Sequence, residues 1–93
     1  MLRHFWVISY DGETMGYDSL VQHHSDLAKE IFDYIDIFYK SNDTKASIQV
    51  SEYRLPKKYR FQDEEEFFNS TQWNDCSFED GTITTTNVTN LKK

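Results

Sequence analysis

The side chains in this sequence that could most readily take part in catalysis or binding are carboxylates, which lie in two groups. The first group lies within one stretch of the chain and comprises Asp63, Glu64, Glu65, Glu66, Asp75, Glu79 and Asp80. The second group recurs at helical spacing and comprises Asp26, Glu30 and Asp33. On a helix such neighbours lie about 5–6 Å apart, which approaches the step between successive phosphates on one DNA strand. Rows of this kind could serve acid–base catalysis, or they could contact a protein surface that binds nucleic acid.

Acid–base catalysis is the less favoured of these two uses. A carboxylic acid that donates a proton near neutral pH must be shielded from water, whereas acids at the start of a helix are expected to be solvated. The sequence has no glycine-rich phosphate-binding loop, since its only glycines are Gly12, Gly16 and Gly81, and each of them fits a hairpin. We therefore expect that the protein is not an enzyme and that it needs no cofactor.

The other side chains that could bind a metal or act as a nucleophile are isolated. His23 and His24 are adjacent, so they point in different directions on most backbones, and no third ligand follows on a shared face. Cys76 is the single cysteine, which excludes an intramolecular disulfide and a multi-cysteine zinc site. We therefore expect no metal site and an unreactive Cys76.

Composition indicates one small globular domain. The chain has 93 residues, of which 16 % are aromatic, and this aromatic content argues against disorder. No apolar run approaches the roughly 20 residues that span a bilayer. The first ten residues lack the long apolar stretch and the cleavage site of a signal peptide. The sequence therefore predicts a cytoplasmic protein.

Charge is segregated along the chain, and segregated charge steers encounters with charged partners. Residues 44–60 carry a net charge of +4, whereas residues 61–81 carry a net charge of −7. The basic stretch has four residues interleaved with aromatic side chains, an arrangement that suits single-stranded nucleic acid, namely Arg54, Lys57, Lys58 and Arg60. The neighbouring acids would repel that ligand, so we favour neutralisation of the basic stretch by the acidic helix of the same chain. A solvated acidic face with no partner stays open as a further interpretation.

The acidic run Asp63–Asn69, with the letters DEEEFFN, resembles a helix start found in a family of phage-encoded anti-CRISPR inhibitors. Proteins of that family are small, acidic and α/β, and their carboxylates imitate DNA to block the site of an effector nuclease that reads the protospacer-adjacent motif. The resemblance covers seven of the 93 residues. It implies a phage or mobile-element inhibitor, with candidate contacts at Asp63, Glu64, Glu65 and Glu66. The element order departs from the family, since this chain is expected to open with a hairpin rather than a helix.

The first half of the chain is expected to form a hairpin and one long helix. Asp11-Gly12 is a strong two-residue turn signal, which sets a register that pairs Ile8 with Met15. Ser25 is the expected N-cap of a helix over residues 26–40. Its apolar residues recur at three- and four-residue spacing and comprise Leu27, Ala28, Ile31, Phe32, Ile35, Phe38 and Tyr39. We expect this stripe to face the core.

The next elements are a strand and a short helix. Alternating apolar residues predict a strand over residues 45–55, and a shift of their phase predicts a bulge near Ser51-Glu52. Asp63, followed three residues later by Glu66, resembles a capping box and predicts a helix over residues 64–71.

A second hairpin is expected at the end of the chain. Asp80-Gly81 would form its turn, with Phe78 paired to Ile83 and Cys76 paired to Thr85. The polar residues 89–93 are expected to form a flexible tail.

These elements predict a single α+β domain over residues 1–88, of order ββαβ(α)ββ, with a mainly antiparallel sheet packed against one main helix. The functional hypothesis is a non-enzymatic acidic inhibitor that acts in the host cytoplasm, as a monomer or homodimer. It would block a basic nucleic-acid-binding site of a host defence or nucleic-acid-processing protein, as a DNA mimic. Two alternatives stay open: an immunity protein that neutralises a nuclease toxin, and a small binder of single-stranded nucleic acid.

Overall fold

The computed structural model describes residues 1–75 and 78–93, without the side chains of residues 74 and 75. Its four-stranded sheet has the order β2-β1-β3-β4, and every neighbouring pair is antiparallel. The strands are β1 (His4–Gly12), β2 (Gly16–Val21), β3 (Lys45–Arg54) and β4 (Thr82–Lys92). The helices are α1 (Leu27–Lys40), α2 (Glu64–Phe68) and α3 (Thr71–Asp75), and a 3-10 turn (His24–Asp26) precedes α1. The predicted α+β class, with an antiparallel sheet and one main helix, is confirmed.

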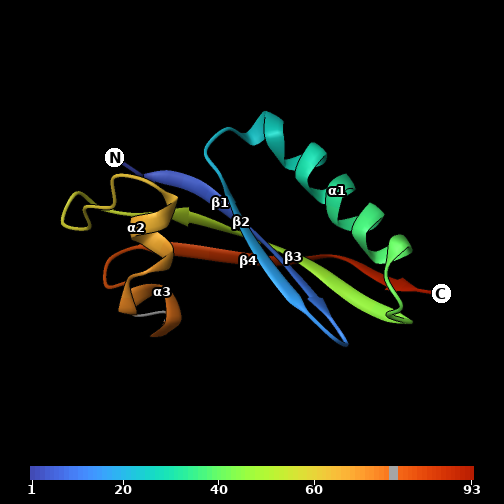
Figure 1. Cartoon of the computed structure of the whole chain (residues 1–93). Coiled ribbons are helices and arrows are strands. Elements are labelled where there is room, and N and C mark those ends of the chain that lie inside the picture. The colour runs from blue at the N-terminus through green and yellow to red at the C-terminus, as the bar shows by residue number, and fades with distance from the viewer. Residues whose placement is uncertain (76–77) are drawn as a thin grey trace.

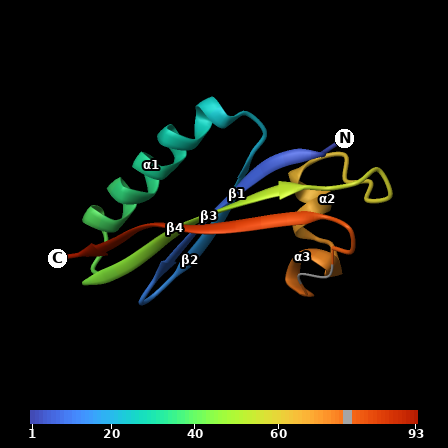
Figure 2. The same ribbon diagram turned by 180° about the vertical axis from the view of Figure 1, so that it is seen from behind.

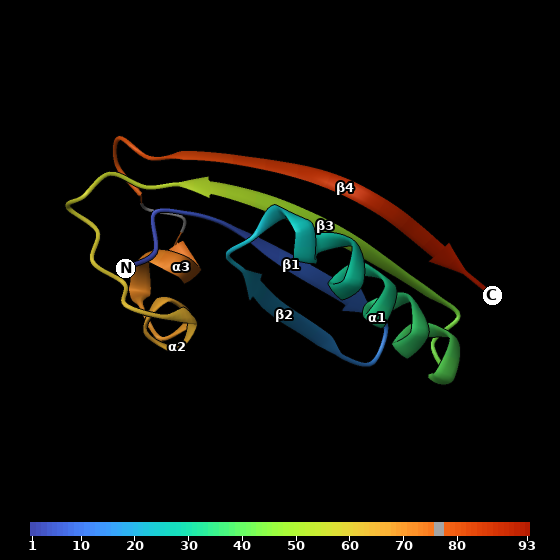
Figure 3. The same cartoon turned by 90° about the horizontal axis from the view of Figure 1, so that it is seen from above.

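The helices cover opposite faces of the sheet at opposite ends (Figures 1 and 3). α1 lies on one face, over the half of the sheet where the chain ends. α2 and α3 lie at the other end of the sheet, where the chain begins, as the view from behind also shows (Figure 2). Successive strand residues point to opposite faces. Ile8 and Tyr10 of β1 therefore pack with α1, and Phe5 and Val7 pack with α2.

Two separate hydrophobic cores result from this arrangement. The α1 core contains Ile8, Tyr10, Val21, Tyr34, Phe38, Ala46, Ile48 and Leu91. The α2 core contains Leu2, Phe5, Val7, Leu20, Tyr53, Leu55, Phe61, Phe67 and Phe78. No helix within residues 1–75 and 78–93 is long and apolar enough to span a membrane.

The long helix forms as predicted, but it exposes part of its apolar stripe. Tyr34 and Phe38, one turn apart, are buried against the sheet. Phe32 is 68 % exposed and Tyr39 is 60 % exposed, so the expectation that they face the core is wrong. A helix turns about 100° per residue, so Phe32, two positions before Tyr34, lies on the far side of the helix. The expected N-cap is also wrong, because Ser25 lies in the 3-10 turn and α1 begins after Asp26.

Tyr34 should make folding sensitive to alkaline pH. Burial raises the pKa of the Tyr34 phenol above its ordinary value of 10.0. The unfolded chain therefore loses this proton first, so the free energy of unfolding is expected to fall as pH rises above 10.0. Denaturant titrations of wild type and Tyr34→Phe across this range should show a shallower decline in the variant. A change to Phe at exposed Tyr39 should leave the decline unaltered, and an equal effect of both changes would contradict the assignment.

The first hairpin forms in a different register from the predicted one. Asp11 pairs with Gly16, so the connection is longer than two residues, and the Gly12 N–H donates to the Met15 carbonyl over 3.0 Å. Ile8 consequently faces Ser19 instead of Met15. Register follows the buried face. The observed pairing brings the apolar end of β2, Leu20 and Val21, into the two cores, which the short turn would have left beyond the ladder.

The predicted strand over residues 45–55 is confirmed as β3, but its bulge lies elsewhere. The register with β4 shifts between Ile48 and Gln49, not at Ser51-Glu52. The change of apolar phase has another cause. Ala46 and Ile48 belong to the α1 core, whereas Tyr53 belongs to the α2 core on the other face. The side chains of β3 alternate regularly between the two faces of the sheet. The apolar phase changes because α1 packs on one face near the start of the strand, whereas α2 packs on the other face near its end.

The predicted second hairpin is wrong. β4 pairs with β3 instead, so that Ile83 lies opposite Tyr53 rather than Phe78. The expected pairing of Cys76 lies outside the described residues. The segment expected to be a flexible tail, residues 89–93, continues β4 as far as Lys92. It is held there because Leu91 is buried in the α1 core.

Candidate acidic binding site

Acids from the starts of α1 and α2 line one groove, which we call the acidic groove. It has a volume of about 540 Å³ and carries Asp26 and Glu30 on the α1 side. On the α2 side it carries Asp63 and Glu64. The end of β2 lies between the two helix starts, where Leu20 and Val21 also line the groove. Two members of each group of carboxylates singled out in the sequence thus line the same groove.

The start of α2 is built by the acids themselves. Asp63 is the N-cap, and its Oδ1 accepts a hydrogen bond from the Glu66 N–H over 3.0 Å. Glu66 folds back, and its Oε2 accepts from the Gln62 N–H over 2.9 Å. The predicted helix start is therefore confirmed. The helix is shorter than predicted and ends at Phe68, because the Asn69 N–H caps it on the Glu65 carbonyl.

These contacts divide the acidic run by role. Asp63 and Glu66 satisfy backbone N–H groups, and acids in a first helical turn also stabilise the positive end of the helix dipole. Glu64 lines the acidic groove, whereas Glu65 and Glu66 line a second hollow. Within the described part of the chain, no basic side chain forms an ion pair with any of these four carboxylates.

One acid of the predicted row on α1 has an ion-pair partner. The Lys29 ammonium lies 3.7 Å from the Asp33 carboxylate, one turn along the helix. Asp33 does not line the acidic groove, whereas Asp26 and Glu30 do. No ion pair involves Asp26 or Glu30 within the described residues. The predicted row thus supplies two groove residues and one compensated residue.

The acids before β4 are compensated by the basic stretch. Lys58 Nζ lies 3.8 Å from Glu79 Oε2 and 3.2 Å from Asp80 Oδ2. The hydrogen bond that Lys58 donates to Asp80 raises the pKa of the Lys58 ammonium, and the charges of both carboxylates raise it further. One residue of the basic stretch, Lys58, is thus neutralised within the chain, by Glu79 and Asp80 and not by the acidic helix. Asp75 lies at the end of α3, and its side chain is outside the described residues.

The remaining basic residues give little support to binding of single-stranded nucleic acid. Arg54 Nη2 lies 3.4 Å from Glu52 Oε2, which offsets its charge. The loop of Lys57 and Tyr59 is held from the N-terminus, because the Arg3 guanidinium donates to the carbonyls of both residues. Lys57 and Arg60 are exposed at the loop surface.

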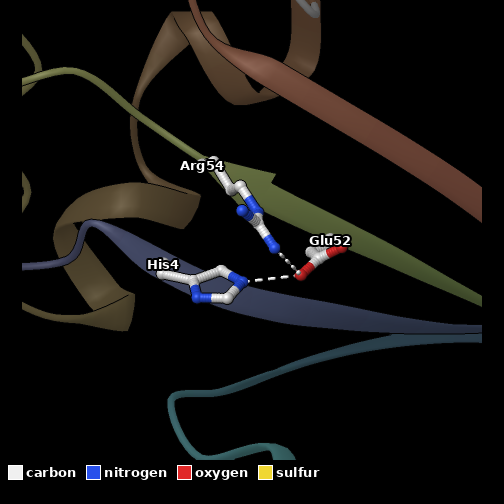
Figure 4. A network of polar contacts seen from close by, with 3 residues as sticks. All are labelled: His4, Glu52 and Arg54. Atoms are coloured by element: carbon white, nitrogen blue, oxygen red, sulfur yellow. Dashed lines mark hydrogen bonds and ion pairs between the residues drawn. The ribbon is translucent and has the colours of Figure 1, made fainter.

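A second polar cluster, of His4, Glu52 and Arg54, lies on the paired strands β1 and β3, and the sequence did not indicate it (Figure 4). His4 Nε2 and Glu52 Oε2 are 2.6 Å apart. The hydrogen bond with His4 lowers the pKa of the Glu52 carboxyl, and Arg54 lowers it further. Trp6 lies between the His4 ring, at 4.6 Å, and the His24 ring, at 5.5 Å. Only the pairing of β1 with β3 brings these residues together, and nothing local in the sequence reveals that pairing.

The two adjacent histidines occupy different surroundings. His24 packs on Trp6, whereas His23 lines the acidic groove. Among the described residues, no three His, Cys, Asp or Glu side chains gather in a way that could hold a metal ion.

Comparison with known proteins returns no relative. No protein-family model, no curated protein and no solved structure matches this chain. The interpretation of the acidic groove therefore depends on the residues of this chain alone.

Proposed function

We propose that this protein is a non-enzymatic acidic inhibitor that occupies a basic nucleic-acid-binding site of a host defence or nucleic-acid-processing protein, as a DNA mimic. The observation that carries the proposal is the meeting of Asp26, Glu30, Asp63 and Glu64 in one groove. These four carboxylates have no ion-pair partners among the described residues and outnumber the one ammonium that lines the groove, that of Lys29, so they create a local negative potential. Such a potential complements a basic surface and accelerates association with it.

The acidic groove is supported by rigid elements on both sides. Tyr34 and Phe38 fix α1 to the sheet, and buried Phe67 fixes α2 to the opposite face. The carboxylates therefore stand on backbone that is already ordered before a partner arrives. Binding by a preorganised surface loses less conformational entropy, so more of the electrostatic attraction appears as affinity.

Exposed aromatic side chains on α1 favour a protein as the partner. Phe32 and Tyr39 project from the outer side of this helix. Aromatic residues are enriched in the centres of protein–protein interfaces, where they fill apolar pockets. A solvated acidic face without a partner would not require them.

Reversal of two groove charges should weaken partner binding. The variant Glu30→Lys with Glu64→Lys leaves the N-cap Asp63 intact, so α2 keeps its start. We expect the amount of partner captured from host lysate to fall by about tenfold or more, because two attractions become two repulsions. The captured protein, identified by mass spectrometry, should bind nucleic acid, and double-stranded DNA should displace the inhibitor from it.

A matched control tests whether position matters or only net charge. Asp11→Lys with Glu13→Lys makes the same change of net charge at the tip of the first hairpin, at the other end of β2 from the groove. This control should retain binding. Equal losses in both double variants would assign binding to net charge, and unchanged binding of the groove variant would contradict the proposal. Capture of a nuclease toxin as the partner would favour the immunity function instead.

A further inference from the structure

β4 forms one margin of the molecule, and no other element lies beyond it (Figure 3). It is the longest strand of the sheet, with 11 residues from Thr82 to Lys92. An edge strand presents a row of backbone N–H and C=O groups that can pair with another chain. The length of β4 makes that row unusually long for so small a domain.

This edge carries few of the features that prevent pairing. Folded proteins protect sheet edges with charged side chains, prolines or very short strands. The other edge strand, β2, has six residues and carries Asp18 in its middle. β4 has no charge and no proline between Thr82 and Leu91, and it is rich in β-branched residues. Its one protective feature is the bulge near Val88, and the run Thr82–Asn87 before it pairs regularly with β3.

The middle of β4 is also exposed to solvent on both faces of the sheet. Ile83 packs against the α2 core and Leu91 is buried in the α1 core. Between them, Thr84–Val88 are all exposed, and the Val88 side chain is 41 % exposed. The two helical layers are staggered, and neither reaches this part of the strand. Backbone bonds to β3 are thus the main support of the segment Thr84–Val88.

We propose that β4 pairs in antiparallel fashion with β4 of a second copy of this chain, which joins the two sheets around a two-fold axis. Such an interface is self-complementary, since the same strand meets itself in reverse. The charges at the ends of the strand fit this occupant. Glu79 and Asp80 precede β4 and share the single ammonium of Lys58, so a net negative charge remains there, and Lys92 and Lys93 lie at the other end. An antiparallel pairing centred on Thr86 brings the lysines of one copy toward the acids of the other.

A charge placed at the centre of this pairing separates the two copies. Thr86→Lys sets two ammonium groups opposite each other, and like charges directly across a ladder are destabilising. Sedimentation equilibrium of the wild-type chain should give twice the monomer mass of 11.1 kDa, and the variant should give the monomer mass. Gln49→Lys is the matched control, because it adds the same charge at an exposed position of the central strand β3. This control should remain dimeric.

A second measurement keeps the proposal testable if Thr86→Lys fails to fold, which circular dichroism would reveal. Amide hydrogen exchange of the wild-type chain should show protection of outward-facing β4 amides that increases with protein concentration. A monomeric wild type, equal dissociation of both lysine variants, or β4 exchange that is independent of concentration would each overturn the proposal. Neither measurement involves the acidic groove, so the result is independent of the inhibitor function.

Discussion

Replacement of Phe67 by Ala is expected to destabilise the domain by about 3–5 kcal/mol, the range found for removal of a buried phenylalanine. Phe67 has no exposed surface. Its ring centroid lies 5.0–6.0 Å from the rings of Phe5, Phe61, Phe68, Tyr53, Trp73 and Phe78. The substitution would leave a cavity at the centre of the α2 core and would detach α2 from the sheet. Urea titration followed by circular dichroism measures the loss.

Phe32→Ala is the matched control for this experiment. It removes the same side chain, but from an outer position of α1 that is 68 % exposed. We expect a change within about 0.5 kcal/mol, as for ordinary surface positions. The same variant should weaken capture of the partner if the exposed aromatic residues contact it. Equal destabilisation by the two substitutions would show that the assignment of α1's outer side is incorrect.

Gly12→Ala is the second substitution with a large expected effect. A Cβ atom at Gly12 would lie 2.3 Å from Asp43 Oδ2 and 3.2 Å from the Met15 carbonyl oxygen. Asp43 is 1 % exposed, and its Oδ1 accepts a hydrogen bond from the Thr14 hydroxyl over 2.8 Å, so its carboxylate has little room to move. Overpacking of a buried site costs about 1–3 kcal/mol. Thermal or urea unfolding should register that loss.

Gly16→Ala tests whether the effect belongs to the close approach or to any alanine in this hairpin. The nearest atom to its added Cβ is the Tyr10 carbonyl oxygen at 3.3 Å, and Gly16 itself is exposed. We expect a change of about 0.5 kcal/mol or less. Comparable losses at Gly12 and Gly16 would contradict the role assigned to Asp43.

Elements with a local signal could be predicted from the sequence. The periodic apolar residues of α1, the alternation in β3 and the cap formed by Asp63 each act within a few residues. Register and partner choice could not be predicted in the same way. The turn residues of the first hairpin favoured a short connection, but burial of Leu20 and Val21 in the two cores outweighed them.

The last strand shows why the end of the chain was difficult to interpret. Thr82–Lys92 is polar, and its residues gave no apolar alternation that indicates a strand. It forms because β3 offers a free edge and because Leu91 reaches the α1 core. The strand is specified by contacts with residues far away in the sequence, which local patterns cannot contain.

The candidate site was predicted in part. Helical spacing grouped Asp26 with Glu30, which both line the groove, but also with Asp33, which does not. The sequence could not show that Asp63 and Glu66 hold the backbone by hydrogen bonds, nor that Asp63 and Glu64 line the groove whereas Glu66 does not. Nor could it show that Lys58 would neutralise Glu79 and Asp80. These distinctions depend on the fold, because each is a contact between separate elements or a choice of rotamer.

Because the two cores are separate, binding at the acidic groove can couple the local unfolding of α1 and α2. α1 is anchored in one core and α2 in the other, so each side of the groove belongs to a unit that can open locally with its own free energy. A partner that binds Glu30 and Glu64 together would stabilise the folded state of both units. Its binding free energy then opposes the opening of either unit, and the two local fluctuations become coupled. The proposed inhibitor surface would thereby link α1 and α2, which pack in separate cores of one domain.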